Sequence, residues 1–591
     1  MRIALTVTII TLYIQPSLAQ RGDWYNDEGG YEFAGEGTKE DPYLIASVEG
    51  LTYLAEQVNI WPGKSFQGEH FRMTADIDLG KHYWIPVGSE AHQSFRGVFD
   101  GNGKRILNLY IGSEDVDNVY SAAGLFGHVG NGARIENLTI AGGRVIGGGR
   151  ESVSRTGSIA GYILCSVSGS EDSIVVRNCH TEDMKITGAD TEISNTGGLI
   201  GECYSLSDGS GQASVVIENC SYGGAVYGRA SGFPYTGGIA GKGAGHGYCN
   251  GEGRSTGLLI LRSCLNRGEI RGGAAMGKEA ITSTGGILGF GYGSGDGGGV
   301  SEGAGSVVIE RCMNAGSVSG GEAVGAQAFS YAGGLAGYGD GYGYSGSTST
   351  AGGGGNYGYG AFVIRTSANR GNVDSGNAVD STSVTSTGGL LGYGSSSAAS
   401  GIEGQEAAYG ILSVRDSYSN AAIRARRGYI GGLAGWVATV GQGAVSAVIR
   451  DSYASGSINK GDTVYPVTTG GIAGNMQRTK EAVRAPQIGN CLVALTYMDG
   501  RLGRTFRIAG QVQGVRQPLS SILGKNYAYV GDGEWMKSAT LKNGLNWSRQ
   551  THRPPVSLWN ERANVWEIKE GSRRYMPLLE QVGGQEEVAI P

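Results

Sequence analysis

TGGLIG at residues 196–201 returns as TGGIAG at 236–241, TGGILG at 284–289 and TGGIAG at 469–474. Looser copies bring the number of hexapeptides to nine, with starts at residues 122, 156, 196, 236, 284, 332, 387, 430 and 469. Successive starts lie 34 to 55 residues apart. A repeat of this length is typical of proteins in which similar units stack and bury a shared core. The sequence therefore predicts a rod rather than a set of globular domains.

A second motif, of the form IENC as at 217–220, lies between the hexapeptides. Its first position is always aliphatic, which suits the inward face of a strand; these residues are Ile135, Val176, Ile217, Leu261, Ile309, Ile364, Val414, Ile449 and Ile488. Its second position alternates in charge through six repeats, in the order Glu136, Arg177, Glu218, Arg262, Glu310 and Arg365. Neighbouring parallel strands lie about 4.8 Å apart, where opposite charges attract and like charges repel. The alternation therefore predicts that successive repeats are adjacent strands, one turn of a solenoid per repeat.

These patterns predict an all-β fold, a right-handed parallel β-helix with about one three-strand turn per 40–55-residue repeat. The three strands would be the hexapeptide, the IENC-type segment and a third segment such as GGAVYG at 223–228. We expect the glycines of TGG to take unusual backbone angles at a tight corner. The third position of the second motif, which is Asn in 137, 178, 219 and 490, predicts a ladder of stacked polar side chains at another corner.

The fourth position of the second motif holds Cys179, Cys220, Cys264 and Cys312, then serine, then Cys491. Because serine replaces cysteine in later turns, we favour free, packed thiols. Disulfides between adjacent turns stay open as the alternative, since an exported chain could form them at this spacing. A metal site is not expected, because neither a paired C-x-x-C nor a histidine cluster accompanies these cysteines.

Composition and the first residues bound the class of protein. The 591 residues include 109 glycines but only 12 prolines, which argues against collagen, and the net charge of −6 gives no sign of nucleic-acid binding. The start, MRIALTVTIITLYIQPSLAQ, has Arg2, a short apolar run and small residues before Ala19. This pattern predicts a signal peptide cleaved after Ala19 and an exported chain, secreted or at the cell surface, with the periplasm as an alternative. We expect no transmembrane segment in the mature chain.

The expected organisation follows from these patterns: a signal peptide at 1–19, a linker at 20–41, a cap with the first turns at 42–112, the repeats at 113–512 and a closing segment at 513–591. The segment 47–59 predicts a capping helix with Ser47 as its N-cap and with Val48, Leu51, Leu54, Ala55 and Val58 on one face. Near the other end, the tryptophans predict a hydrophobic cap, with a sugar-stacking platform as the alternative; they are Trp535, Trp547, Trp559 and Trp566.

Several stretches together resemble the GLUG-motif proteins of bacterial, Bacteroidetes-type cell surfaces. They are GEGTKEDPYLIASVEGLTYLAEQVN at 35–59, FRGVFDGNGKRILNLYI at 95–111 and the repeated hexapeptide with its second motif. The resemblance implies an exported β-helical protein, often adhesin-like. GLUG repeats also occur in immunoglobulin A-degrading metallopeptidases, but this chain has no HExxH, so that activity is not expected here.

The longer repeats carry their extra residues in one part of the turn, at 290–305, 338–360 and 393–410. We expect these Gly-, Ser- and Tyr-rich segments to be loops that project from one side of the rod and bind a partner. Tyrosine offers apolar contact and a hydroxyl group at little entropic cost, which suits a glycan or a protein surface. The candidate binding residues are Tyr292, Tyr338, Tyr342, Tyr344, Tyr357, Tyr359, Tyr393 and Tyr409. Flexible loops without a partner, or self-association, are the alternatives.

No catalytic constellation stands out. Enzymes on β-helices need clustered acids, or acids with a basic residue; GHG at 245–247 lacks paired aspartates in neighbouring turns, and Asp296 and Asp340 each stand alone. The sequence therefore predicts a non-catalytic, adhesin-like protein without cofactor or metal. A carbohydrate-active enzyme (polysaccharide lyase or glycoside hydrolase) and a structural surface or matrix component remain as alternatives.

Overall fold

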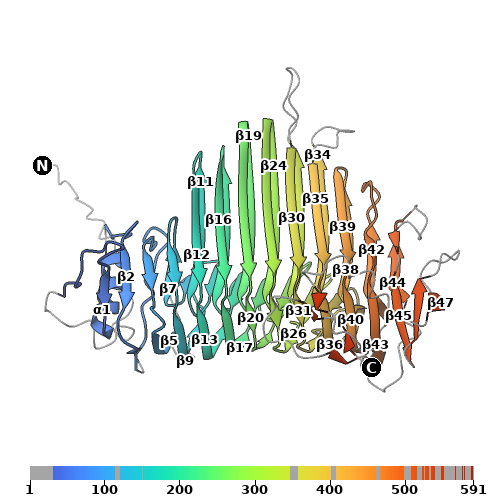
Figure 1. Ribbon diagram of the computed structural model, residues 1–591, viewed down its shortest axis with the longest axis horizontal. Helices are drawn as coiled ribbons and strands as arrows, with labels where there is room; N and C mark the ends of the chain where they lie inside the picture. Colours follow the sequence, from blue (N-terminus) through green and yellow to red (C-terminus); the bar gives the residue numbers. More distant parts are fainter. Residues whose placement is uncertain are drawn as a thin grey trace, which may run out of the picture.

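The computed structural model describes residues 31–60, 62–80, 82–113, 120–149, 151–345, 357–400, 408–460, 466–497 and 507–515, and short pieces beyond them at 522–524, 526–531, 534–538, 547–551, 566–567, 575–576, 578–579 and 588–589. These residues form a rod of stacked strands that runs from the blue to the red end of the chain in Figure 1, with long strands standing up along one side. The predicted signal peptide (1–19) and residues 20–30 of the predicted linker lie outside the described residues.

One turn in the middle of the rod contains four strands, β14 (Ile193–Gly197), β15 (Ile200–Asp208), β16 (Gly211–Glu218) and β17 (Ser221–Tyr227). Each pairs in parallel with its counterpart one repeat later, for example Thr196 with Thr236 and Glu218 with Arg262. The predicted parallel β-helix with one turn per repeat is therefore confirmed. The turn differs from the expected three strands because the hexapeptide is not a strand: it spans the corner between β14 and β15.

The aliphatic column of the second motif lies inside the rod. Its nine members are at most 2% exposed and stack from turn to turn. The next column points outward, and its opposite charges meet as predicted: Glu310 lies 3.1 Å from Arg262 and 3.2 Å from Arg365. Each half-exposed pair adds little stability by itself, but the column fixes which strands are neighbours.

The third column of the second motif forms the predicted polar corner. All nine residues, from Asn137 to Asn490, have φ between 50 and 56°, the left-handed region that asparagine tolerates best among residues with a side chain. The amides also bond to each other, because Asn219 Nδ2 donates to Asn178 Oδ1 at 2.7 Å and Asn178 Nδ2 donates to Asn137 Oδ1 at 2.9 Å. The choice of residue at the third position therefore depends on the left-handed backbone as well as on the hydrogen bonds between stacked amides.

The cysteine column is buried beside this corner, and all eight cysteines are free thiols in the structure. Cys220 Sγ, for example, donates to the carbonyl oxygens of Val176 at 3.6 Å and Glu218 at 3.2 Å. The serines that follow in later turns make the equivalent bond, as from Ser367 Oγ to the Arg365 carbonyl at 2.8 Å. A small hydrogen-bonding side chain is what this position requires.

The expectation that the TGG glycines take unusual backbone angles is wrong: in the described copies at 196–201, 236–241 and 284–289, neither glycine has a positive φ. Glycine is required at these positions because there is no space for a side chain. A Cβ on Gly197 would lie 1.9 Å from the Ile200 carbonyl oxygen, and one on Gly198 would lie 2.2 Å from the Gly238 carbonyl oxygen of the next turn. The corner is therefore closed by backbone packing within and between turns.

The two ends of the rod differ from the turns between them. Helix α1 (Val48–Asn59) buries Leu51, Leu54, Ala55 and Val58 as predicted, whereas the Ser47 side chain makes no capping hydrogen bond. At the other end the parallel stack gives way to an antiparallel meander of β45 (Tyr527–Gly531), β46 (Glu534–Ser538) and β47 (Trp547–Thr551). Of the four tryptophans expected to close the rod, Trp559 lies outside the described residues, and only backbone is described for the other three.

Candidate binding face

The Gly-, Ser- and Tyr-rich insertions form strands, so the expectation of loops is wrong wherever the structure describes them. Residues 290–305 belong to β24 (Leu288–Glu310), and 338–345 and 357–360 belong to β29 (Ala336–Ser345) and β30 (Tyr357–Arg365). Residues 346–356 and 401–407 lie outside the described part. These long strands rise from one side of the rod in Figure 1, and we call this projection the fin.

The fin consists of two parallel sheets that pack back to back. In each turn the chain ascends in one sheet and descends in the other: the first half of β19 (Ala240–Arg262) pairs with β15, and its second half pairs with β16. Glycine fills the space between the sheets, since a Cβ on Gly257 would lie 2.1 Å from the His246 carbonyl oxygen and one on Gly360 would lie 1.9 Å from the Tyr342 carbonyl oxygen. Sheets with ordinary side chains between them pack about 10 Å apart. Glycine at every second residue lets these two backbones touch.

The glycine alternation sends every other side chain outward, onto either an ascending or a descending face. Of the predicted tyrosines, Tyr292, Tyr338, Tyr342, Tyr344 and Tyr393 lie on ascending strands. Tyr357, Tyr359 and Tyr409 lie on descending strands. The eight residues therefore do not form one binding face, and the two groups have to be considered separately.

On the ascending face, the aromatic residues nearest the rod stack on each other. We call this column the base ladder; it contains Phe290, Tyr338, Tyr393 and Trp436, with Trp436 on β38 (Ala434–Gly441). The Phe290 and Tyr338 ring centroids are 4.5 Å apart with an interplanar angle of 5°, and those of Tyr338 and Tyr393 are 5.1 Å apart. Burial raises the pKa of the Tyr338 and Tyr393 hydroxyls. Tyr338 is stacked between Phe290 and Tyr393, whereas Tyr393 meets Trp436 edge to face at 74°, and these ring contacts stabilise the fin.

Next to the rod, on the same face, a charge cluster continues the base ladder toward the N-terminus. Glu202 on β15 is nearly buried between Arg155 at 2.6 Å and Lys242 at 2.9 Å. Burial alone would raise the pKa of Glu202, but the two cations and their hydrogen bonds hold it below its usual value. Glu202 pairs with both cations, and the cluster keeps a net charge of +1.

Farther from the rod lies a column in which acid and tyrosine alternate. In adjacent strands the register places Asp208, Tyr248, Asp296 and Tyr344 side by side, and we call this the rim ladder. Tyr342, His246 and Ser294 occupy the neighbouring column. Burial raises the pKa of Asp296 and lowers that of His246. Neither of these two columns contains lysine or arginine, so the charge of the rim ladder is negative.

Asp340 lies between the two ladders and is almost fully buried beside Tyr292 and Ser395. Burial raises its pKa to about 6, although the Ser395 and Ser397 hydroxyls act in the opposite direction. Its Oδ1 atom has no hydrogen-bond partner in the structure. Asp340 is thus the acid of this face that is held closest to neutrality.

Asp296 and Asp340 of the ascending face are not spaced for paired-carboxylate chemistry. Asp296 pairs with Tyr344, four residues beyond Asp340 on β29, and four residues of strand span about 13 Å. Paired carboxyl groups in glycoside hydrolases lie within about 9.5 Å of each other. Among the described residues no group of three or more His, Cys, Asp or Glu side chains is arranged to hold a metal ion. What the face offers is a row of hydroxyl and carboxylate groups for hydrogen bonds.

Sequence reasoning missed Tyr248, Asp208 and Trp436 as members of these ladders. The available signal was the two-residue alternation of glycine with larger residues, as in GYGSGDG at 291–297, which is the period of a strand. Read as strands, the insertions can be aligned between turns, and the aligned positions give the columns.

Comparisons with known proteins give partial matches. No family model matches the chain. A stretch of 114 residues, 18% of the chain, is 35% identical to a "Putative Gly-rich membrane protein" of Evansella cellulosilytica and covers 12% of it. A stretch of 183 residues, 27% of the chain, is 31% identical to Halomucin of Haloquadratum walsbyi and covers 2% of it. The chain therefore spans only a small part of either relative.

Among solved structures, the chain is similar to "a putative immunoglobulin A1 protease from Bacteroides ovatus", with 13% identity and coverage of 93% of this chain and 94% of that one. The TM-score is 0.29, which is too low to carry an argument about function.

Proposed function

We propose that this protein is an exported, non-catalytic, adhesin-like β-helix that binds a glycan chain across the ascending face of its fin. The rim ladder is the observation that carries the proposal. It repeats Asp–Tyr every two strands, about 9.6 Å along the rod, and a polymer of sugar units presents hydroxyl groups at regular intervals. Carboxylates and tyrosine hydroxyls on rigid strands can bond several such units at once.

The charge of the rim ladder favours a neutral glycan. Asp208 and Asp296 have no cation beside them in their own or the neighbouring column, so an acidic polysaccharide would be repelled. This also argues against the polysaccharide-lyase alternative, in which acids would work together with a basic residue on an anionic substrate. If no glycan binds, the test below also asks whether the partner is a protein surface.

Export is supported by the signal-like start of the chain and is compatible with the words "membrane" and "Halomucin" in the names of the two partial relatives. The helices that the structure describes include none long and apolar enough to cross a membrane. Membership of the GLUG-motif proteins stays a prediction.

The test compares two double variants that remove tyrosines from opposite faces of the same pair of strands. Tyr342→Ser/Tyr344→Ser alters the ascending face, and Tyr357→Ser/Tyr359→Ser alters the descending face. Binding to an array of neutral and acidic glycans should fall at least tenfold for the first variant and stay unchanged for the second, with matching thermal unfolding curves. Equal binding by all three proteins would remove the ascending face from consideration. If no glycan is bound, pull-down with the same variants tests a protein partner.

A further inference from the structure

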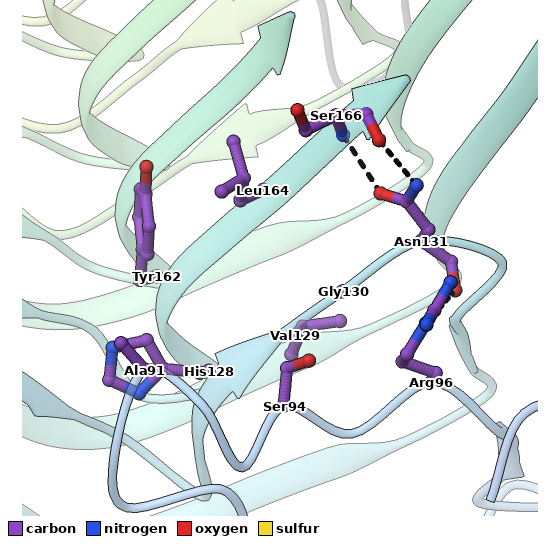
Figure 2. A pocket seen from close by; sticks show the side chains of 10 residues that line it. All are labelled: Ala91, Ser94, Arg96, His128, Val129, Gly130, Asn131, Tyr162, Leu164 and Ser166. Carbon is purple, nitrogen blue, oxygen red and sulfur yellow. Dashed lines mark hydrogen bonds between the residues drawn. The ribbon is translucent and has the colours of Figure 1, made fainter. Parts of the chain in front are cut away.

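A cavity of about 240 Å³ lies at the N-terminal end of the ascending face, next to the strand on which the rim ladder begins. It arises from a difference in strand length. Strand β7 (Phe126–Val129) has four residues, whereas its neighbour β11 (Ala160–Ser168) has nine and extends beyond it. In Figure 2, Tyr162, Leu164 and Ser166 follow one another along β11, and the segment with Ser94 and Arg96 runs below them, where Phe95 pairs with Val129. The cavity is smaller than the roughly 300–1,000 Å³ of drug-sized ligand sites, which favours a ligand with a single ring.

One end of the cavity holds a guanidinium group that is fixed in place without a carboxylate. Arg96 Nε donates to the Asn131 carbonyl oxygen at 3.1 Å. The Asn131 side chain is itself held, because its Nδ2 donates to the Ser166 carbonyl at 2.5 Å and its Oδ1 accepts from the Ser166 amide at 2.8 Å (Figure 2). No ion pair of the described residues involves Arg96, and its two Nη groups remain as parallel donors. This is the arrangement that binds a carboxylate with both oxygens.

The other end combines a neutral imidazole with a tyrosine. His128 is 5% exposed, and its Nδ1 lies 3.0 Å from the Gly88 carbonyl oxygen, which can only accept, so the proton is on Nδ1 and Nε2 is an acceptor. Burial lowers the pKa of His128, which keeps the ring neutral near pH 7. The Tyr162 ring is held by the Arg155 guanidinium, 4.4 Å from its centroid. At this end, His128 Nε2 can therefore accept a hydrogen bond from a ligand hydroxyl, and the Tyr162 hydroxyl can form another.

Between these ends, Val129 and Leu164 supply an apolar surface and Ser94 supplies a hydroxyl. A pyranose ring has an apolar C–H face and hydroxyls around its edge, and a uronic acid adds one carboxylate at the side of that ring. We propose that the cavity is a binding site for a uronic acid, with the carboxylate on Arg96 and the ring over Val129 and Leu164. The proposal does not depend on the rim ladder, which lies on other strands and carries the opposite charge.

The test is titration calorimetry of the whole protein with D-glucuronate and D-galacturonate, and with D-glucose as the neutral control. We expect saturable binding of at least one uronate and at least tenfold weaker binding of glucose. Arg96→Gln should weaken uronate binding at least tenfold, and Arg96→Lys should fall between, because lysine keeps the charge but lacks the two parallel donors. Arg72→Gln is the matched control: it removes an arginine from the same first turns, where it pairs with Asp100 outside the cavity, and should leave binding unchanged.

A second variant keeps the proposal testable if Arg96→Gln disturbs folding. Leu164→Trp fills the cavity and leaves every charge in place, so it should abolish uronate binding. A free sugar acid and the end of an acidic glycan share this chemistry, and the methyl glucuronide and digalacturonate distinguish them: binding of both indicates a chain end, and binding of the free acid alone indicates a metabolite. Absence of saturable binding by either uronate, or equal binding by glucose or by Arg96→Gln, would overturn the proposal.

Discussion

At the scale of single residues, the left-handed corner of each turn sets the strictest requirement. Nine successive corner residues have φ near 50–56°, and four of them are asparagine. Thr366 has the same backbone angle, with φ of 50°, although a β-branched residue is the least suited to it. The rod therefore carries local strain at Thr366 that asparagine would not have.

The first prediction follows from that strain. Thr366→Asn should stabilise the protein by up to about 1 kcal/mol, since asparagine occupies the left-handed region at lower cost. The reverse change, Asn219→Thr, should destabilise it by more, because it also removes the hydrogen bond to Asn178. Urea unfolding midpoints of the two variants measure both effects. A Thr366→Asn protein that unfolds at lower urea than the wild type would contradict the assignment of strain.

Asp340 is strained electrostatically rather than sterically. Its pKa rises from 3.8 to about 6 because burial penalises the carboxylate. Between these values the folded protein binds the proton more tightly than the unfolded chain does, so the contribution of Asp340 to stability is greatest below about pH 4 and is lost as the pH rises to about 6. A rise of this size corresponds to about 3 kcal/mol above pH 6.

The second prediction is therefore that removing the Asp340 carboxylate stabilises the protein by an amount that depends on pH. Asp340→Asn should raise the unfolding midpoint at pH 7.5 and have little effect at pH 4, where the wild-type carboxyl is protonated. The exposed Asp208, changed to Asn, serves as the control and should shift neither midpoint. An equal effect of Asp340→Asn at the two pH values would show that the hydrogen bonds of the side chain matter and its charge does not.

At the scale of the strand, the fin depends on glycine between its two sheets. The third prediction is that Gly360→Ala destabilises the fin by at least about 3 kcal/mol, because its Cβ would lie 1.9 Å from the Tyr342 carbonyl oxygen and the two sheets would have to separate. Gly489 is the matched control. It lies on a strand, its φ is not positive, and a Cβ at this position would have no atom within 4 Å, so Gly489→Ala should be neutral or slightly stabilising.

Hydrogen exchange reports this difference locally. Amides of β29 and β30 should exchange faster in Gly360→Ala, whereas those of β14 and β17, away from the fin, should not. Unchanged protection of the fin strands would mean that the sheets can accommodate a methyl group between them.

The strands of the rod could be predicted from the sequence more completely than those of the fin. The columns that begin at Ile135 and Glu136 were predictable because each turn supplies one residue and the requirement repeats at every turn. The fin was not predictable, because the constraint on a residue such as Gly257 comes from the backbone of His246, which comes near only when the ascending and descending sheets pack together. The same reason explains why a positive φ was wrongly expected at Gly198: the carbonyl that requires glycine there belongs to Gly238 in the next turn. The eight candidate tyrosines could be named from the sequence, but their division between two faces could not be predicted from it.

At the scale of the whole molecule, the charge column makes the rod a lattice with a period of two turns. Glu136, Arg177, Glu218, Arg262, Glu310 and Arg365 alternate along it, so Glu218 and Glu310 each lie between two bases, and the Glu310 carboxylate contacts both of its neighbours. A solenoid otherwise tolerates loss of a repeat, because each unit contacts only its neighbours. In this rod, removing an odd number of turns from the alternating part should bring like charges together, whereas removing an even number should keep opposite charges adjacent.

The fourth prediction compares two deletions that preserve the hexapeptide register. Removing 236–283 joins Tyr235 to Thr284 and places the Glu218 strand against the Glu310 strand, with like charges about 4.8 Å apart. Removing 236–331 joins Tyr235 to Ala332 and places Glu218 against Arg365, so alternation is kept. Salt should therefore stabilise the one-turn deletion and not the two-turn deletion, because raising the ionic strength from about 0.1 to 1 M shortens the screening length from about 10 to 3 Å.

A further one-turn deletion separates the effect of charge from that of length. Removing 387–429 takes out Arg415 and leaves Arg365 beside Arg450, a pair of the same sign as those already present in that part of the column. Its unfolding midpoint should respond to salt as the wild type does, although it also lacks a single turn. If all three deletions respond alike, the alternation would be irrelevant to stacking, and register would have to be set by the corner asparagines and the packed glycines alone. If only the 236–283 deletion responds, the order of charges in one column limits how such a rod can gain or lose turns.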